Sequence, residues 1–129
     1  MVQNNGESLA YLGDSLYEFE IRKLLISLGY TNVNIMHKMA IKYTSGVSQA
    51  KIVDYLLTKE LLSESEISIY KRGRNSNHSA NRRKIDRVSY QKATGFEALI
   101  GFLYLDDKLD RALEIINLGI NYVRSNLDE

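Results

Sequence analysis

Apolar residues recur every three or four positions along most of the chain, which is the spacing of one buried face on an α-helix. The first such run predicts a helix over residues 8–28, and Gly29 is a typical residue for its end. Its inward face is expected to carry Leu9, Leu12, Leu16, Phe19 and Leu24. Gly13 and Asp14 interrupt this run, although glycine inside a helix costs about 1 kcal/mol relative to alanine. The pair therefore needs an explanation.

Four or five further helices follow the first. Asn34 is expected to cap a second helix, which breaks near Gly46 and is followed by a third helix that buries Val53, Leu56, Leu57 and Leu61. Ser63 and Glu66 have the spacing of a capping box, which predicts the start of a short fourth helix. Residues 72–81 read RGRNSNHSAN, a composition typical of turns.

Two longer helices close the pattern. One is predicted over residues 90–105, with an inward face of Phe96, Leu99, Ile100 and Leu103. The last begins near Asp107 and carries a seam of Leu109, Leu113, Ile116, Ile120, Val123 and Leu127. Residues 1–129 are therefore predicted to form a single all-α domain of five or six helices.

The composition supports this prediction and narrows the class of protein. The chain has 129 residues, 44% of them hydrophobic, which is enough for one core. Proline is absent, which favours an all-helical chain, and the absence of cysteine excludes disulfides and cysteine metal sites. The sequence has no apolar run long enough to span a bilayer and no signal-peptide pattern at its start. We therefore expect a cytoplasmic protein without a membrane partner.

The charge is distributed unevenly, although the net charge is only +1. Residues 71–87 contain seven basic side chains and a single acid, Asp86. One interpretation is a solvated loop with internal ion pairs, and the other is a surface that binds nucleic-acid phosphates. The concentration of charge favours the second. The candidate RNA contacts are Lys71, Arg72, Arg74, Asn75, Arg82, Arg83 and Lys84.

Two acidic residues stand out against the apolar pattern. Asp14 is expected on the side of the first helix away from Leu12 and Leu16, where a solvated position is the simplest interpretation. Glu97 follows Phe96 close to an apolar stripe, where an exposed head group or an arginine partner would explain it. Neither acid indicates a site when it is considered alone.

Considered together, the segments LAYLGDSLYE (9–18) and TGFEALIGFLYLD (94–106) resemble the two signature helices of the ribonuclease III family. The resemblance covers essentially the whole chain, so we expect no additional double-stranded-RNA-binding domain. Together with KRGRN (71–75), this makes the chain similar to the compact mini-ribonuclease III subfamily, which has the ribonuclease III endonuclease-domain fold alone.

The resemblance implies a function and a site. Asp14 and Glu97 match the family's magnesium-binding acids, and Mn²⁺ is an expected substitute for Mg²⁺. Two other familiar acids are replaced by Ala10 and Thr94, as in the subfamily's reduced acidic set. Tyr11, Glu18 and Thr94 are candidates to support the metal ligands, although an ion pair between Glu18 and Arg22 is the simpler expectation.

The implied activity is magnesium-dependent hydrolysis of double-stranded RNA that leaves 5′-phosphate ends, with maturation of the 23S ribosomal RNA precursor as the expected task. A homodimer with this first helix at its two-fold interface is implied too, with Gly13 facing the partner's helix, and a ribosomal protein is a candidate assistant. The main alternative is a non-catalytic RNA-binding or ribosome-associated protein, which the replacements at Ala10 and Thr94 favour. A DNA-binding module is a weaker alternative, because no recognition helix is evident.

Overall fold

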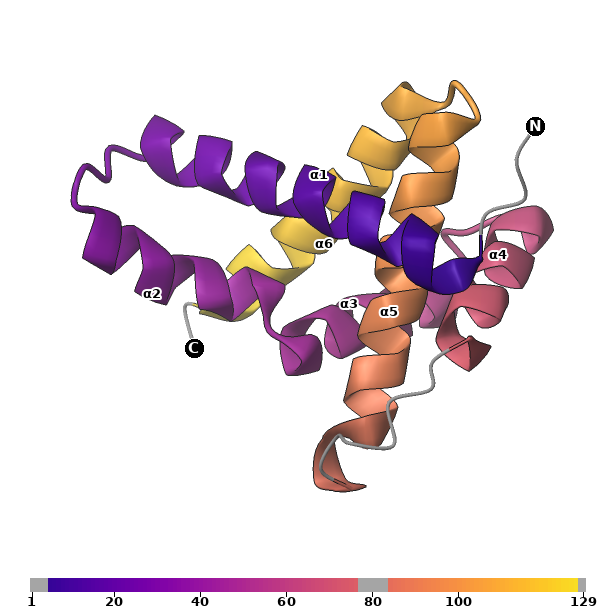
Figure 1. The fold of residues 1–129 in the computed structure, drawn as a ribbon. Coiled ribbons are helices and arrows are strands. Elements are labelled where there is room, and N and C mark those ends of the chain that lie inside the picture. Colours follow the sequence, from indigo (N-terminus) through magenta and orange to yellow (C-terminus); the bar gives the residue numbers. More distant parts are fainter. Residues whose placement is uncertain (1–4, 77–83, 128–129) are drawn as a thin grey trace.

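The computed structural model describes residues 5–76 and 84–127, and this part of the chain contains six α-helices and no strand (Figure 1). The all-α prediction is therefore confirmed. The helices are α1 (Gly6–Ser27), α2 (Val33–Thr44), α3 (Gly46–Thr58), α4 (Glu64–Asn75), α5 (Lys84–Leu105) and α6 (Leu109–Leu127). None of them is long and apolar enough to cross a bilayer.

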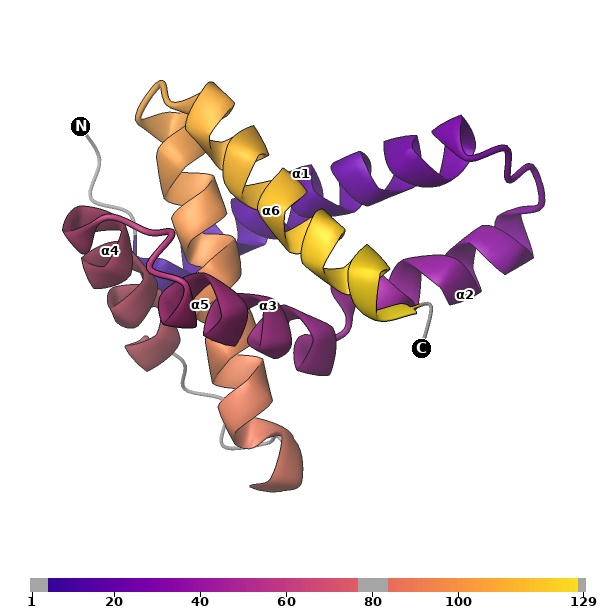
Figure 2. The same ribbon diagram turned by 180° about the vertical axis from the view of Figure 1, so that it is seen from behind.

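Helix α5 lies at the centre of the fold and contacts α1, α3, α4 and α6. Between residues 93 and 103, only Glu97 and Phe102 are not fully buried. Seen from behind, α3 and α6 lie on the side of α5 away from α1 (Figure 2). Because neighbours surround this part of α5, any polar side chain on it must find a partner inside the protein or point through a gap between helices.

Two glycines allow α1 and α5 to touch through their backbones. A Cβ atom on Gly13 would overlap the carbonyl oxygen of Glu97 and lie 2.8 Å from the amide nitrogen of Gly101. A Cβ atom on Gly101 would in turn overlap the carbonyl oxygen of Leu9. Gly13 therefore faces α5 of its own chain, and the expectation that it faces a partner's helix is wrong.

The hairpin of α1 and α2 extends to one side and returns to the core at the end of α2. Ser45 ends α2 and also caps α3, where its hydroxyl accepts a hydrogen bond from the Ser48 amide at 3.1 Å. The hydroxyl of Tyr17 in α1 donates to the carbonyl oxygen of Tyr43 at 2.8 Å. The last turn of α2, whose carbonyls lack helical partners, is thus tied to α1.

The predicted capping box of α4 is present. Ser63 and Glu66 exchange backbone and side-chain hydrogen bonds of 2.8 and 3.2 Å. Glu66 also binds the guanidinium of Arg111 in α6, with both of its carboxylate oxygens accepting at 2.8 Å. This double role explains why Glu66 is buried, since its charge is paired and fully hydrogen-bonded.

Several predicted details are wrong. The deepest residues of α1 are Tyr17, Ile21 and Leu25, which lie on the same face of the helix as Gly13. The contact of Gly13 with α5 directs this face into the core, and Phe19 is 58% exposed. Asn32, not Asn34, caps α2 through a hydrogen bond from the Ile35 amide.

The ends of the later helices also differ from the predictions. Helix α4 continues through Asn75 into the segment predicted as a turn, and α5 begins six residues before position 90, at Lys84. The end residues of the predicted α6 seam, Leu109 and Leu127, are exposed, whereas its centre is buried. The end of α4 packs on α5, where a Cβ atom on Gly73 would lie 2.5 Å from the Cβ of Ala98, whereas residues 86–88 of α5 are exposed.

We predict that Gly13→Ala lowers the free energy of unfolding by about 1–3 kcal/mol or more, because its Cβ would meet backbone atoms that cannot rotate away. Gly46→Ala is the matched control, since no atom lies within 4 Å of a Cβ at that position. We expect the control to be neutral or to stabilise by a few tenths of a kcal/mol, up to about 1. Chemical denaturation measures both changes, and equal stabilities for the two variants would contradict the proposed contact.

Candidate functional site

The structure brings Asp14 and Glu97 together from two helices far apart in the sequence. Asp14 directly follows Gly13, whose backbone packs against the carbonyl of Glu97. The two carboxyl groups lie within hydrogen-bonding distance of each other. Asp14 is exposed and Glu97 is half-buried, so the pair is open to solvent on the Asp14 side. Among the residues that the structure describes, the partners of Glu97 are Asp14 and Gln49, and not an arginine.

The environment of the pair favours a shared proton. Burial raises the pKa of Glu97 to about 8, and the hydrogen bond that protonated Glu97 donates to Asp14 and the nearby charges of Asp14 and Glu18 act in the same direction. The hydrogen bond from Gln49 acts in the opposite direction, because it favours the ionised form. Two carboxylates this close repel each other when both are ionised, unless a proton or a cation lies between them.

Aromatic residues support the pair from within the core. Tyr17 lies one turn after Asp14 in α1, and Phe96 precedes Glu97 in α5. Their rings meet edge to face, with centroids 5.4 Å apart. Burial holds the pKa of the Tyr17 hydroxyl well above its usual range, with smaller contributions from Tyr43, Glu18 and Glu97. Tyr17 therefore stays neutral and acts as a packed support rather than as an acid or base.

Gln49 is the one neighbour of the pair whose role the sequence analysis did not identify. It lies in the first turn of α3 and is only 2% exposed. Its Nε2 atom donates to Glu97 Oε2 at 3.1 Å and to the Thr44 carbonyl oxygen at 3.0 Å. No local pattern signals this contact, because the three residues belong to three different helices.

The three expected supporting residues occupy different environments. The Glu18 carboxylate forms an ion pair with Arg22 at 3.7 Å, which confirms the simpler expectation. Its charge also raises the pKa of Glu97. The Thr94 hydroxyl is buried and donates to the Tyr90 carbonyl of its own helix at 3.0 Å. Tyr11 is 85% exposed. Only Glu18 is thus connected electrostatically to the pair.

Residues 9, 10 and 98 form a small apolar cluster beside the crossing of α1 and α5. Ala10, where the resemblance leads us to expect an acid, is buried in this cluster with Ala98. Among residues 5–76 and 84–127, no group of three or more acidic or histidine side chains lies together in a way that could hold a metal ion. Any cation at this place would therefore have the two carboxylates of Asp14 and Glu97 as its protein ligands.

The basic segment begins on α4 and only part of it is described. Lys71, Arg72 and Asn75 are exposed on the last turns of α4. The Arg74 guanidinium lies 5.7 Å from the centre of the Tyr70 ring, and its Nε donates to Asn75 Oδ1 at 3.2 Å. Arg82 and Arg83 lie outside the described residues, and Lys84 begins α5.

Comparisons with known proteins show which proteins this chain resembles. Residues 7–108 match the family model described as the ribonuclease III domain. The chain is 50% identical to a mini-ribonuclease 3 of Acholeplasma laidlawii, over 93% of this chain and 94% of that protein. It is 44% identical to a mini-ribonuclease 3 of Enterococcus faecalis, over 94% and 92%. A crystal structure of a Fusobacterium nucleatum protein is similar at a TM-score of 0.79 and 32% identity, and the match covers 92% of this chain and 93% of that one.

The raised pKa of Glu97 predicts a pH dependence of stability in the presence of a metal chelator. Folded Glu97 keeps its proton up to about pH 8, whereas the unfolded chain loses it near 4.5, so its contribution is complete below 4.5 and is lost as pH rises through 8. We therefore expect the unfolding free energy of the wild type to fall relative to Glu97→Gln over this range. Denaturation at a series of pH values measures it, and parallel profiles would show that the pKa is not raised.

Proposed function

The chain belongs to the ribonuclease III family and is an endoribonuclease of that type, and we propose that Asp14 and Glu97 form its cleavage centre. The observation that carries this proposal is the meeting of the two carboxyl groups at the glycine contact of α1 and α5. Enzymes of this family act on double-stranded RNA and generally use divalent metal ions. An acid pair that is open to solvent can be reached by an RNA duplex and can hold a divalent cation.

The donor set of the pair fits magnesium. Mg²⁺ prefers hard oxygen ligands, keeps several waters and is commonly held by one or two carboxylates together with substrate phosphates. Asp14 offers an exposed carboxylate, and Glu97 offers a second one once its proton has left. We therefore propose Mg²⁺ as the cofactor, with Mn²⁺ as a substitute. When bound, such an ion lowers the pKa of a coordinated water and neutralises charge on the phosphate.

The two acids have separate tasks in this proposal. Asp14 would hold the cation from the exposed side of the pair, and Glu97 would hold it from the half-buried side, where its contact with Gln49 restrains it. Hydrolysis then transfers the oxygen of water to phosphorus and breaks the bond to the 3′-oxygen, which leaves with a proton. The products are a 5′-phosphate and a 3′-hydroxyl.

We propose that the basic segment 71–87 holds the duplex beside the acid pair. Lys71 and Arg72 are exposed on α4 and have no ion pair among the described residues. The end of α4 packs against α5 close to Glu97, since a Cβ atom on Gly73 would lie 2.5 Å from the Cβ of Ala98. Phosphates that contact these cations would thus lie next to the cleavage centre.

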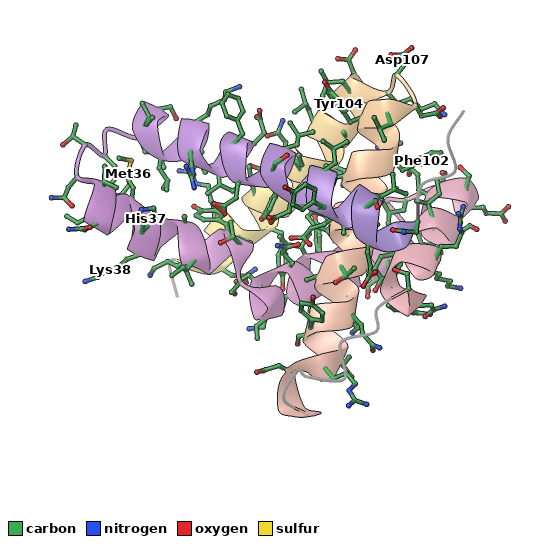
Figure 3. The ribbon with its side chains drawn as sticks, viewed as in Figure 1. Met36, His37, Lys38, Phe102, Tyr104 and Asp107 are labelled. Atoms are coloured by element: carbon green, nitrogen blue, oxygen red, sulfur yellow. The ribbon has the colours of Figure 1, made fainter. Side chains whose placement is uncertain are left out.

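We also propose that the protein acts as a homodimer. One acid pair can cut one strand, so cutting both strands of a duplex requires two pairs related by a two-fold axis. Apolar side chains near the crossing of α1 and α5 are exposed: Tyr11 of α1 is 85% exposed, and Tyr104 of α5 is 47% exposed. Figure 3 labels Tyr104. An uncovered apolar surface beside the acids supports a second chain at this place.

The wider role follows from the similarity to the mini-ribonuclease 3 proteins. We propose that the substrate in the cell is the 23S ribosomal RNA precursor, cut in the cytoplasm, with a ribosomal protein as a candidate assistant.

Replacing either acid is expected to remove cleavage. Asp14→Asn and Glu97→Gln should each lower the rate of cutting a long RNA duplex in magnesium by at least about a hundredfold, because each removes an anionic ligand. Gel analysis of the products measures this change, and cutting at the wild-type rate would contradict the assignment.

Both variants should sediment like the wild type at the mass of two chains, and a mass of one chain would contradict the dimer.

Removing the exposed cations of α4 should weaken RNA binding. We expect the double substitution Lys71→Ala and Arg72→Ala to lower affinity for duplex RNA and to reduce the slope of log affinity against log salt by about 1 per lost phosphate contact. The matched control is Lys38→Ala with Lys42→Ala, which removes the same charge from exposed positions of α2, a helix on the opposite side of the molecule from α4 (Figure 1). Filter binding across salt concentrations measures both, and identical slopes for the two pairs would contradict the proposed contact.

A further inference from the structure

Gln49 is buried deep in the fold, yet its side chain is only half satisfied. Its Nε2 atom makes two hydrogen bonds, to the Thr44 carbonyl oxygen and to Glu97 Oε2. Among the described residues, its Oε1 atom is the single buried side-chain nitrogen or oxygen atom that has no hydrogen-bond partner. A buried acceptor without a partner destabilises the folded state, so stability alone does not explain a glutamine at this position.

The orientation of the Gln49 amide is fixed by its partners. The Thr44 carbonyl can only accept a hydrogen bond, so the amide nitrogen must face it, and the same nitrogen then reaches Glu97. A reversed amide would place an oxygen against two acceptors. The arrangement thus presents a donor to one chosen oxygen of Glu97 and leaves Oε1 without a partner.

The contact with Thr44 anchors this donor to a rigid part of the fold. Thr44 is the last residue of α2, and Gln49 lies in the first turn of α3, on the other side of the shared cap Ser45. Gln49 is therefore fixed at both ends, by a backbone carbonyl and by the core packing of α3. A carboxylate that binds such a donor loses its freedom to rotate away from Asp14.

We infer that Gln49 is a positioning residue that holds the Glu97 carboxylate in the orientation in which it meets a divalent cation shared with Asp14. This inference rests on the proposed cleavage centre and goes beyond it, because it assigns a requirement to a residue that touches neither RNA nor cation. A methionine of similar shape would fill the same space without the donor and would leave Glu97 free to adopt other orientations.

The experiment compares Gln49→Met with Thr44→Val by measuring Mn²⁺ binding and RNA cleavage. Thr44→Val removes a hydroxyl at the corner between α2 and α3, which donates to the Ala40 carbonyl oxygen. It keeps the Thr44 carbonyl that anchors Gln49. Calorimetric titration of the RNA-free protein with Mn²⁺ should show about tenfold weaker binding for Gln49→Met and unchanged binding for Thr44→Val. In RNA cleavage, Gln49→Met should lower kcat and leave KM for the duplex unchanged, because the basic segment is intact.

The outcomes separate this inference from the proposed centre. If the wild type binds Mn²⁺ and Gln49→Met binds it equally well, the positioning role is refuted while the centre stands. If the wild type binds no Mn²⁺, the centre itself is refuted, and the inference with it. Thermal unfolding of each variant verifies the fold, and Gln49→Leu, which also lacks the donor, replaces Gln49→Met if that variant does not fold. A loss of Mn²⁺ binding in Thr44→Val equal to that in Gln49→Met would assign the effect to the corner as a whole.

Discussion

The backbone contact between α1 and α5 is the constraint on which the rest of the site depends. Helices that pack through ordinary side chains keep their axes 8–10 Å apart, whereas Gly13 and Gly101 let the two backbones touch. A side chain next to such a contact needs little length to reach the neighbouring helix, and Asp14 is the residue that follows Gly13. The glycine that weakens α1 as an isolated helix is thus what allows a short aspartate to meet Glu97.

The end of α2 gives the site a second fixed point. Its last two carbonyls accept hydrogen bonds from side chains that belong to different helices: Tyr17 of α1 binds the Tyr43 carbonyl, and Gln49 of α3 binds the Thr44 carbonyl. Tyr17 is one turn from Asp14, and Gln49 binds Glu97 directly. The surroundings of both acids are therefore anchored to the end of α2. This restricts the two carboxyl groups to one relative position.

Features that depend on residues close together in the sequence could be predicted from the sequence alone. The capping box of Ser63 and Glu66 and the break at Gly46 need only neighbouring residues, and both were predicted. The inward face of α1 was misjudged at Phe19, because the helix is turned by a contact with residues some ninety positions away. Asp14 and Glu97 were found through their resemblance to a family and not through periodicity. Gln49 was missed as a partner of Glu97, since three helices must meet before its donor has an acceptor.

Ser45 is both the last cap of α2 and the first cap of α3, so no spare residue separates the two helices. Each residue of an α-helix advances the side-chain direction by about 100°. Lengthening this corner by a single amino acid would therefore swing every later side chain of α3 around the axis, and the amide now facing α5 would point elsewhere. The connection between α2 and α3 therefore has a fixed length, and an insertion that most surface connections would tolerate would here remove the contact between Gln49 and Glu97.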